Sequence, residues 1–289
     1  MTATGAVFVP DFSVLGVDSE PIRRAWTPDD TIRYALGVGA GQADPSAELS
    51  FTTENSVGFA ARALPTYATI VAANVPGLRA GRYDPATAVH AEQSFRLHRP
   101  LPVSGAVLVR SQITGIYDQG SGALSITRTT ASDEGTGETL ITAESAGFIR
   151  GGGGFGGPRR PAQEWSAPTE EPDRQVVCPT RRDQALLYRL SGDRNPLHSD
   201  PAFAQRAGFP QPILHGLCTY GITGRVLLAT VAGDDPDRLA GMSGRFTGVV
   251  YPGDTLVVSV WLRPHGAVFR TARLDGTVVI DRGQCAVAG

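Results

Sequence analysis

The sequence lacks the charge and the apolar runs that mark several classes of protein. Its 26 basic residues stand against 28 acidic ones, which gives a net charge of −2. Nucleic acids and anionic membrane surfaces bind clusters of basic residues, so the composition predicts neither as a partner. No apolar stretch free of Gly, Pro and charge reaches the roughly 18–20 residues of a membrane-spanning helix. The sequence therefore predicts no membrane span.

Cysteine is also scarce, and no targeting segment is evident. The three cysteines, Cys178, Cys218 and Cys285, are odd in number and widely spaced, without a zinc-binding or CxxC pattern. The first positive charge after the N-terminus is Arg23, so a secretory signal with a basic start is not predicted. The last residues, 286–289, are not a peroxisomal signal. These absences favour a reduced, cytosolic protein.

The material that is present predicts two folded units. Hydrophobic residues make up 41% of the 289 residues, which is enough for a full core, and domains average roughly 150 residues. A glycine-rich run starts at Gly151, and a Pro- and Glu-rich stretch continues it to about Asp173. No GK[ST] follows the glycines, so a flexible connector is favoured over a phosphate-binding loop. We therefore predict an N-terminal repeat over 1–150, a linker over 151–173 and a C-terminal repeat over 174–289.

The two halves show the same order of predicted elements, after an irregular start over residues 1–30. The first half has a helix over 67–75 and strands over 88–97, 103–113, 123–129 and 138–150. The second has a helix over 217–231 and strands over 243–250, 255–262, 267–273, 278–280 and 284–287. Leu64 and Leu214 precede the two helices 150 residues apart, and Gly105 and Gly253 precede strands 148 residues apart. Such matched spacing indicates a duplication.

One helix followed by about four antiparallel strands is typical of the hot-dog arrangement. We therefore predict an α+β double hot-dog fold, with two such repeats in one chain. A wrapped helix must be apolar on most faces. Residues 217–231 fit moderately, since Gly221 and Gly224 each weaken the helix by about 1 kcal/mol but allow close packing. Hot-dog sheets pair edge to edge, which predicts a homodimer unless the two repeats pair within the chain.

The densest polar cluster lies between Tyr188 and Pro201 and holds Asp193, Asn195 and His198. Asn195 followed by Pro196 is a helix-start signal, and one tight turn there would bring Asp193 and His198 to the same side. A carboxylate and an imidazole that face one cavity can hold a water and exchange protons. The structural alternatives are a helix cap for Asp193 and a core histidine for His198. A metal site would need a third ligand, His215 or Asp200, at a spacing that matches no known pattern.

A second candidate element is His215-Gly216, at the start of the long apolar helix. Free N–H groups at a helix N-terminus favour negative charge, and glycine lets a ligand oxygen approach closely. Gly216 would then form an oxyanion site, although it could simply be a tight entry to a buried helix. The matching segment of the first half, Tyr34–Ala40, is apolar and glycine-rich. We therefore expect one active site per chain, with the first half holding apolar ligand.

These segments together resemble the MaoC-like (R)-specific enoyl-CoA hydratases, in particular the double hot-dog hydratase 2 type. The resemblance covers most of the chain and is most specific in the Asp193-x-Asn195-Pro196-x-His198 segment with its downstream His215-Gly216. It is carried by Tyr188–Pro201, Gly208–Gly221, Tyr34–Gly39, Leu64–Tyr67, His90–Gln93, Gly152–Gly157 and Arg245–Phe246.

The resemblance implies reversible hydration of a trans-2-enoyl-CoA to the (R)-3-hydroxyacyl-CoA, without a metal or a redox cofactor. The family pattern implies that Asp193 and His198 grip the water and that Asn195 helps to orient it. It also implies that the Gly216 N–H receives the thioester oxygen. We assign His198 as the base toward water and Asp193 as the proton donor to the α-carbon. The two roles could be exchanged, because a coupled pair shares its titration.

The resemblance also implies substrate-binding residues in both halves. His90, Ala91 and Phe246 match substrate-lining positions, and Arg194, Pro196 and Leu197 are further candidates from the polar cluster. Gln119 stands where the family often has a lysine that meets a CoA phosphate, and Ala91 where it often has glycine. Because Gln119 lacks the charge of that lysine, the acyl carrier could be CoA or another group.

Two other functions fit the same fold. A hot-dog thioesterase would release the free thiol instead of adding water. A non-catalytic acyl-binding subunit would bind the thioester without turnover, and the intact set of Asp193, Asn195 and His198 argues against it.

Overall fold

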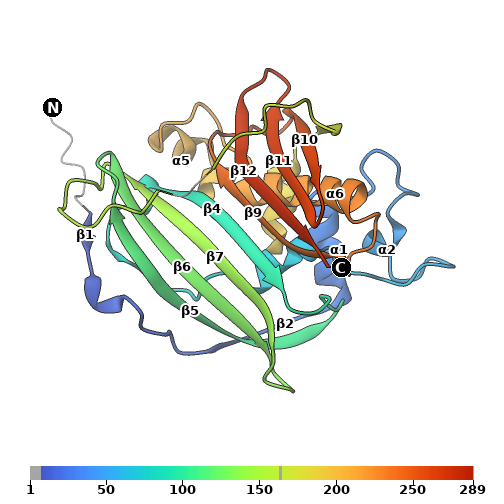
Figure 1. Ribbon diagram of the computed structural model, residues 1–289, viewed down its shortest axis with the longest axis horizontal. Helices are drawn as coiled ribbons and strands as arrows, with labels where there is room; N and C mark the ends of the chain where they lie inside the picture. Colours follow the sequence, from blue (N-terminus) through green and yellow to red (C-terminus); the bar gives the residue numbers. More distant parts are fainter. Residues whose placement is uncertain (1–7, 163–164, 289) are drawn as a thin grey trace.

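The structure is a computed structural model that describes residues 8–162 and 165–288. The parts of the predicted repeats and linker at 1–7, 163–164 and 289 lie outside the described residues. Within these bounds the strands form one ten-stranded antiparallel sheet and one two-stranded ribbon (Figure 1). The order of the large sheet is β2-β5-β6-β7-β4-β9-β12-β11-β10-β8. None of the described helices is long and apolar enough to cross a membrane.

The N-terminal repeat contributes the first five strands of this order and several short helices. Its sheet strands are β2 (Ile22–Trp26), β4 (Ala88–Leu97), β5 (Gly105–Asp118), β6 (Gly122–Asp133) and β7 (Thr139–Arg150). Its α-helices are α1 (Pro28–Gly37), α2 (Leu49–Thr52) and α3 (Ala68–Val71), and the 3-10 turns are η1 (Phe12–Val14), η2 (Pro65–Tyr67) and η3 (Pro85–Thr87). The ribbon pairs β1 (Val9–Pro10) with β3 (Gly81–Arg82).

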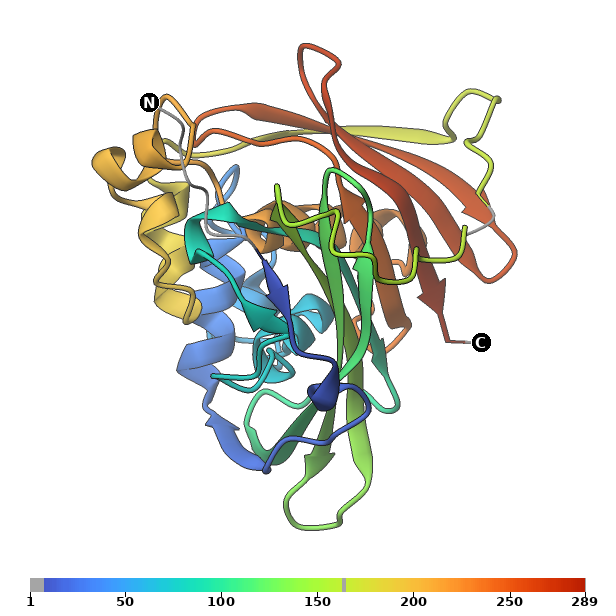
Figure 2. The same cartoon turned by 90° about the vertical axis from the view of Figure 1, so that its left-hand side faces the viewer.

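The C-terminal repeat contributes the other five strands and the longest helix. Its strands are β8 (Arg174–Pro179), β9 (Leu239–Phe246), β10 (Thr255–Arg263), β11 (Gly266–Arg273) and β12 (Val278–Val287). Its helices are α4 (Gln184–Tyr188), α5 (Pro201–Arg206) and α6 (Gly216–Val231), with 3-10 turns η4 (Arg189–Ser191) and η5 (Pro196–His198). Helix α1 packs against α4 across the boundary between the repeats, and Figure 2 shows the blue helix next to the golden one.

The two repeats join through an antiparallel pair, β4 with β9, in the middle of the sheet. Ser94 faces Ser243 at the centre of this pair, and the register runs from Glu92 opposite Arg245 to Arg96 opposite Gly241. The predicted double hot-dog fold is thus confirmed, and the edge-to-edge pairing is made inside one chain.

Helix α6 lies in the core between the two repeats and has the predicted extent. Its two internal glycines stand where the first repeat touches it most closely. A Cβ at Gly221 would lie 2.5 Å from Val38 Cγ1, and one at Gly224 would lie 2.3 Å from Thr66 Cγ2. As predicted, these glycines allow α6 to pack closely, here against the first repeat.

The prediction of a matching helix over 67–75 in the first repeat was wrong, because α3 ends at Val71. Pro76 disfavours a helical conformation at Val75. The guanidinium of Arg24 donates hydrogen bonds to the carbonyls of Val71, Ala73 and Asn74, so β2 satisfies the carbonyls that a longer helix would use.

Three other predicted elements need correction. The strand expected over 243–250 is β9, which already ends at Phe246. The chain leaves the sheet there, and the carbonyl of Val250 instead accepts a hydrogen bond from Leu214 N, just before α6 in the sequence. The strands expected over 278–280 and 284–287 are one strand, β12, with a bulge near Arg282, whose φ is 54°. Part of the irregular start is ordered: β2 forms there, and α1 begins with a capping box of Thr27 and Asp30.

The glycine run after β7 is held in place rather than free. The carboxylate of Asp118 accepts hydrogen bonds from the backbone N–H groups of Gly120, Gly154 and Gly156 at 2.9–3.0 Å. These bonds lower the pKa of Asp118. The expected flexible connector is therefore wrong for this stretch. Since a carboxylate of the same chain occupies these amides, the loop has none of the three left to bind a phosphate.

Candidate active site

The polar cluster folds as a short loop that ends in the single turn η5. Asn195 caps this turn, since its Oδ1 accepts a hydrogen bond from Leu197 N at 3.0 Å, and Pro196 fixes the first position of the turn. Asp200 then caps α5 in the same way. The predicted cap signals are thus confirmed, and their effect is to place His198 at the inner end of the loop.

His198 is buried and has one ring nitrogen available to a ligand. Its Nδ1 lies 2.8 Å from the carbonyl oxygen of Ile213. A carbonyl only accepts, so Nδ1 carries the hydrogen and Nε2 keeps a free lone pair. Burial lowers the pKa of His198 below its ordinary value, although the Ile213 bond and Asp193 oppose the shift. The ring is therefore held neutral, with Nε2 able to accept a proton.

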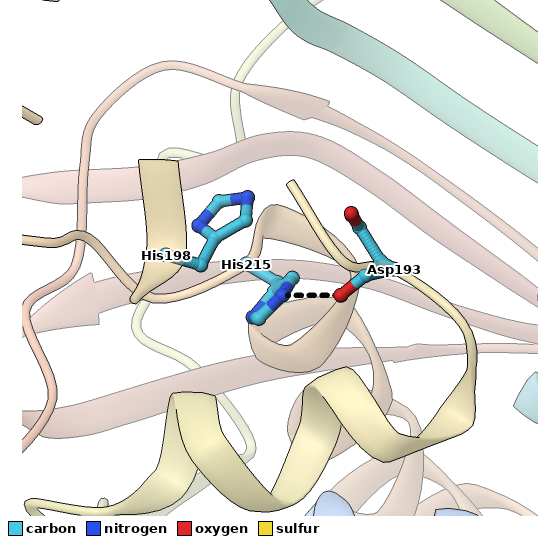
Figure 3. A group of neighbouring side chains, drawn as sticks. All are labelled: Asp193, His198 and His215. Carbon is cyan, nitrogen blue, oxygen red and sulfur yellow. Dashed lines mark hydrogen bonds between the residues drawn. The ribbon is translucent and has the colours of Figure 1, made fainter. Parts of the chain in front are cut away.

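Asp193 lies in the exposed loop after Gly192, whose φ of 127° favours glycine. Its Oδ1 accepts a hydrogen bond from Asn195 N at 3.0 Å. A carboxylate oxygen of Asp193 and a ring nitrogen of each of His198 and His215 all lie within 4.8 Å of one another (Figure 3). The sequence prediction that one turn brings Asp193 and His198 to the same side is confirmed, while their catalytic roles stay predictions.

Gly216 is the first residue of α6, directly after the N-cap His215. Among the described residues, no group accepts a hydrogen bond from Gly216 N. The ring of Phe246 packs so closely that a Cβ at Gly216 would lie 3.3 Å from it. Gly216 lines the same cavity as Asp193 and His198. An unpaired amide at the N-terminus of a 16-residue helix thus borders the cavity.

The cavity that these groups share, here called the inner cavity, has a volume of about 200 Å³. The first repeat closes it with Ala88, Val89 and His90. A β-bulge at Ala91 shifts the pairing of β4 with β7 between His90 and Glu92. The His90 ring lies 5.0 Å from the ring of Phe246, centre to centre, and burial lowers its pKa. The site is therefore built from both repeats.

Two further cavities share lining residues with the inner one. An outer cavity of about 550 Å³ shares Val89, His90 and Phe246 with it and is lined also by Ala91 and Gln119. A side cavity of about 320 Å³ shares Val89 and His90 as well and begins where α3 ends. One chain of cavities thus runs past His90.

The outer cavity carries three guanidinium groups, from Arg160, Arg245 and Arg282. Glu92 pairs with Arg160 at 2.7 Å, and Asp281 pairs with Arg270 at 3.0 Å. Glu92, which faces Arg245 across the strands, and Asp281, which precedes Arg282, therefore each form an ion pair with another arginine. Arg245 and Arg282 give the outer cavity positive charge.

The structure separates the predicted substrate-binding residues into two groups. His90, Leu197 and Phe246 line the inner cavity, and Ala91 and Gln119 line the outer one. Arg194 and Pro196 are exposed and are not part of either lining. Two histidines that lie outside these cavities, His98 and His265, are exposed.

Sequence reasoning did not single out Arg160, Arg282 or the carbonyl of Ile213. A backbone carbonyl leaves no trace in the residue type, so nothing in the sequence could have pointed to Ile213. Arg282 reaches the outer cavity from the bulge of β12, and the only signal was the break between the two short strands predicted there.

The group of Asp193, His198 and His215 is also close enough to hold a metal ion. However, His215 Nε2 lies 3.3 Å from the carbonyl oxygen of Asp193, so this nitrogen carries a hydrogen and has no lone pair for a metal. Metal binding through Nε2 would have to break that bond, so His215 could offer a metal only its buried Nδ1.

Fold and cavity together define a double hot-dog protein with an acid, an imidazole and a free helix amide around one cavity. Comparison with known proteins agrees with this class. Residues 25–151 match the MFE-2 hydratase 2 N-terminal domain, and residues 163–283 match the MaoC like domain.

Several similar proteins match nearly the whole length of the chain. 3-Hydroxyacyl-thioester dehydratase Y of Mycobacterium tuberculosis is 46% identical over 285 residues, 94% of this chain and 97% of that protein. Enoyl-CoA hydratase 2, peroxisomal, of Arabidopsis thaliana is 37% identical, covering 92% and 90%. The crystal structure of a MaoC-like dehydratase from Phytophthora capsici superposes with a TM-score of 0.83 at 30% identity, covering 95% and 96%. The chain belongs to the MaoC-like hydratase 2 family.

Proposed function

We propose that this chain is an enzyme, a hydro-lyase that catalyses the reversible hydration of trans-2-enoyl-CoA to (R)-3-hydroxyacyl-CoA. The observation that carries the proposal is the approach of Asp193 and His198 within 4.8 Å beside the unpaired amide of Gly216. The names of the relatives, enoyl-CoA hydratase 2 and 3-hydroxyacyl-thioester dehydratase, support it.

His198 activates the water in this proposal. Its Nε2 accepts a proton from the water, and the water oxygen forms the new bond to C3 of the enoyl group. The Nδ1 bond to Ile213 fixes the tautomer that can do this. Since burial lowers the pKa of His198, the ring stays unprotonated somewhat below its ordinary pKa.

Asp193 supplies the proton that C2 receives. The C2=C3 π bond breaks, one C–O bond and one C–H bond form, and the elements of one water are consumed without any transfer of electrons to a redox group. Asp193 therefore enters the step as the carboxylic acid. His198 gains one proton from the water while Asp193 gives one to C2, and transfer of a proton from His198 back to Asp193 resets the site. The backbone N–H of Asn195 donates a hydrogen bond to the Asp193 side chain. The side chain of Asn195 caps the turn that carries His198.

The spacing of the pair predicts the stereochemistry of addition. Groups on opposite faces of a planar enoyl would each need hydrogen-bond reach of roughly 3 Å or more, so they would stand about 6 Å or more apart. Asp193 and His198 lie closer than that. Both therefore act on the same face, and the hydrogen and the hydroxyl add syn.

Gly216 stabilises the intermediate charge. As oxygen adds at C3, electron density moves to the thioester oxygen, which becomes an enolate oxygen. The free N–H of Gly216, at the positive end of α6, donates a hydrogen bond to it.

The outer and side cavities suggest how the rest of the substrate lies. The outer cavity, with Arg245, Arg282 and Gln119, suits the phosphate groups of CoA, since guanidinium groups bind phosphates in a bidentate manner. Arg245 and Arg282 would then make the phosphate contact that the family often makes with a lysine at the position of Gln119. The side cavity suits the acyl chain, because the short α3 leaves this volume open.

The test is to give the purified chain trans-2-hexenoyl-CoA. We expect loss of the absorbance of the conjugated thioester, with (R)-3-hydroxyhexanoyl-CoA as product by chiral chromatography and no free thiol by a thiol-reactive dye. Release of thiol without hydration would indicate the thioesterase, and tight binding without turnover would indicate an acyl-binding subunit. Either result would contradict the proposal.

The sequence also predicts a cytosolic location, and we propose it together with a homodimer that pairs through edges other than those of β4 and β9. Because β4 and β9 pair within the chain, the edges left for a second copy are β2 and β8, and β8 exposes Val177. Sedimentation equilibrium at micromolar concentration should give twice the chain mass of 30.4 kDa, and a monomer would contradict the dimer.

A further inference from the structure

His215 lies directly behind the two proposed catalytic groups. Its side chain is buried, with 1% of the residue exposed. One face of its ring stacks on His198, with centres 3.7 Å apart and planes 27° apart. The Tyr188 ring packs 4.9 Å away at 53°. Figure 3 shows the His215 ring next to His198, with its bond to Asp193 dashed.

The polar contacts of His215 fix its protonation. Its Nε2 donates to the carbonyl oxygen of Asp193 at 3.3 Å, so the hydrogen is on Nε2. Its Nδ1 is buried and has no partner among the described residues, so a second hydrogen there would find no acceptor. Burial and the neighbouring His198 lower the pKa of His215 to about 3. His215 is therefore a neutral donor and cannot share protons with the substrate.

Among the described residues, few other groups hold Asp193 in place. The residue lies between η4 and η5 in a loop without regular structure, and its side chain is exposed. Its carboxylate accepts from Asn195 N, and its carbonyl accepts from His215 Nε2. The ring of His198 is held by the Ile213 carbonyl at its edge and by His215 on its face. His215 is thus the side chain that contacts both partners of the pair.

We infer that His215 is a positioning residue for the hydration reaction: its Nε2–H holds the Asp193 backbone while its ring sets the plane of His198. A carboxylate oxygen of Asp193 and a ring nitrogen of His198 then lie within 4.8 Å of each other, a separation that one bridging water can span. This inference rests on the proposed function and extends it to a residue that does not take part in the chemistry.

The test uses two substitutions that separate the two contacts. His215→Phe keeps a ring to stack on His198 but removes the donor to Asp193. His215→Gln places an amide N–H where Nε2 was but removes the ring. We expect kcat for trans-2-hexenoyl-CoA to fall between about tenfold and a hundredfold in His215→Phe, because a misplacement near 1 Å costs on that order. KM should change little, and His215→Gln should recover several-fold of the lost kcat.

A double-mutant cycle distinguishes positioning from a merely structural role. In the Asp193→Asn background, His215→Phe should lower kcat much less than in the wild type, since the effect acts through Asp193. Equal losses in both backgrounds, or equal kcat in His215→Phe and His215→Gln, would overturn the inference. The exposed His265→Gln serves as the control and should keep the wild-type rate.

This outcome is separable from failure of the proposed function. If the wild type hydrates the enoyl-CoA but His215→Phe matches its rate, only the positioning role is overturned. If the wild type does not hydrate it, the proposed function itself fails. The near-ultraviolet circular dichroism of each variant shows that loss of rate does not come from loss of the fold.

Discussion

The ring of His90, from the N-terminal repeat, packs 5.0 Å from the ring of Phe246, from the C-terminal repeat. The contact exists because β4 and β9 pair at the centre of the sheet and because the bulge at Ala91 turns the chain beside His90. Phe246 in turn borders Gly216, which lines the inner cavity. One repeat therefore supplies the acid, the imidazole and the amide, while the other closes the cavity over them.

The first prediction concerns the proposed catalytic pair. Asp193→Asn and His198→Gln should each lower kcat for trans-2-hexenoyl-CoA by at least about a hundredfold, because proton transfer by a positioned group contributes about that much. Asp200→Asn is the matched control, since Asp200 is in the same segment but only caps α5. The measurement is the initial rate of absorbance loss. Rates near that of the wild type in either active-site variant would show that the pair is misassigned.

Loss of positive charge in the outer cavity should weaken binding of a CoA thioester but not of a pantetheine thioester. Arg245→Gln and Arg282→Gln should raise KM for the CoA thioester by roughly tenfold each, because each removes a charge-assisted contact to phosphate. The same acyl group carried on pantetheine has no nucleotide phosphates, so its kinetics should not change. Equal effects on both thioesters would place the nucleotide elsewhere.

Stability should fall on mild acidification. Burial lowers the pKa of His90, His198 and His215 in the folded chain, whereas the unfolded chain titrates near 6.5. Below pH 6.5 the unfolded state therefore binds more protons, so the free energy of unfolding decreases as pH falls. The free energy of unfolding in urea should be lower at pH 5.5 than at pH 7.5, and His215 alone should contribute roughly 1 kcal/mol of the difference because its pKa falls to about 3.

His215→Phe is the control for this pH effect. Without His215, the difference in the free energy of unfolding between the two pH values should shrink by roughly 1 kcal/mol. The carboxylates titrate mainly below this range, so they contribute little. A difference as large as that of the wild type would show that His215 is not held neutral in the folded chain.

The contact of α6 with the first repeat predicts the effect of a small substitution. Gly224→Ala gains about 1 kcal/mol of helix propensity. However, its Cβ would lie 2.3 Å from Thr66 Cγ2 in a buried contact, and overpacking costs about 1–3 kcal/mol. We expect a net loss of about 1 kcal/mol in urea unfolding, recovered when Thr66→Ala is added. If Gly224→Ala alone is more stable, the close packing is wrong.

Much of the fold could be predicted because the residues within each segment indicate its structure. The spacing of Leu64 and Leu214 marks the duplication, and the apolar run over 217–231 predicts α6 at its observed length. The missing part of the first helix could not be predicted from its own residues. Arg24, distant in sequence, donates to the carbonyls at its end, and such a tertiary contact overrides local propensity.

The candidate site divides in the same way. Asn195, Pro196 and Asp200 give cap signals that fix the local turn, so the approach of Asp193 to His198 could be predicted. The Ile213 carbonyl, the stacking of His215 and the convergence of Arg160, Arg245 and Arg282 depend on chain segments far apart in the sequence. These were visible only in the folded chain.

The most direct test of the central claim, that Asp193 and His198 work on one face of the substrate through one water, is hydration in D2O. The relative configuration of deuterium at C2 and hydroxyl at C3 can be read from proton coupling constants in the product. The short distance between the two groups predicts syn addition with the (R) configuration at C3. Anti addition would require an acid and a base on opposite faces and would contradict the account.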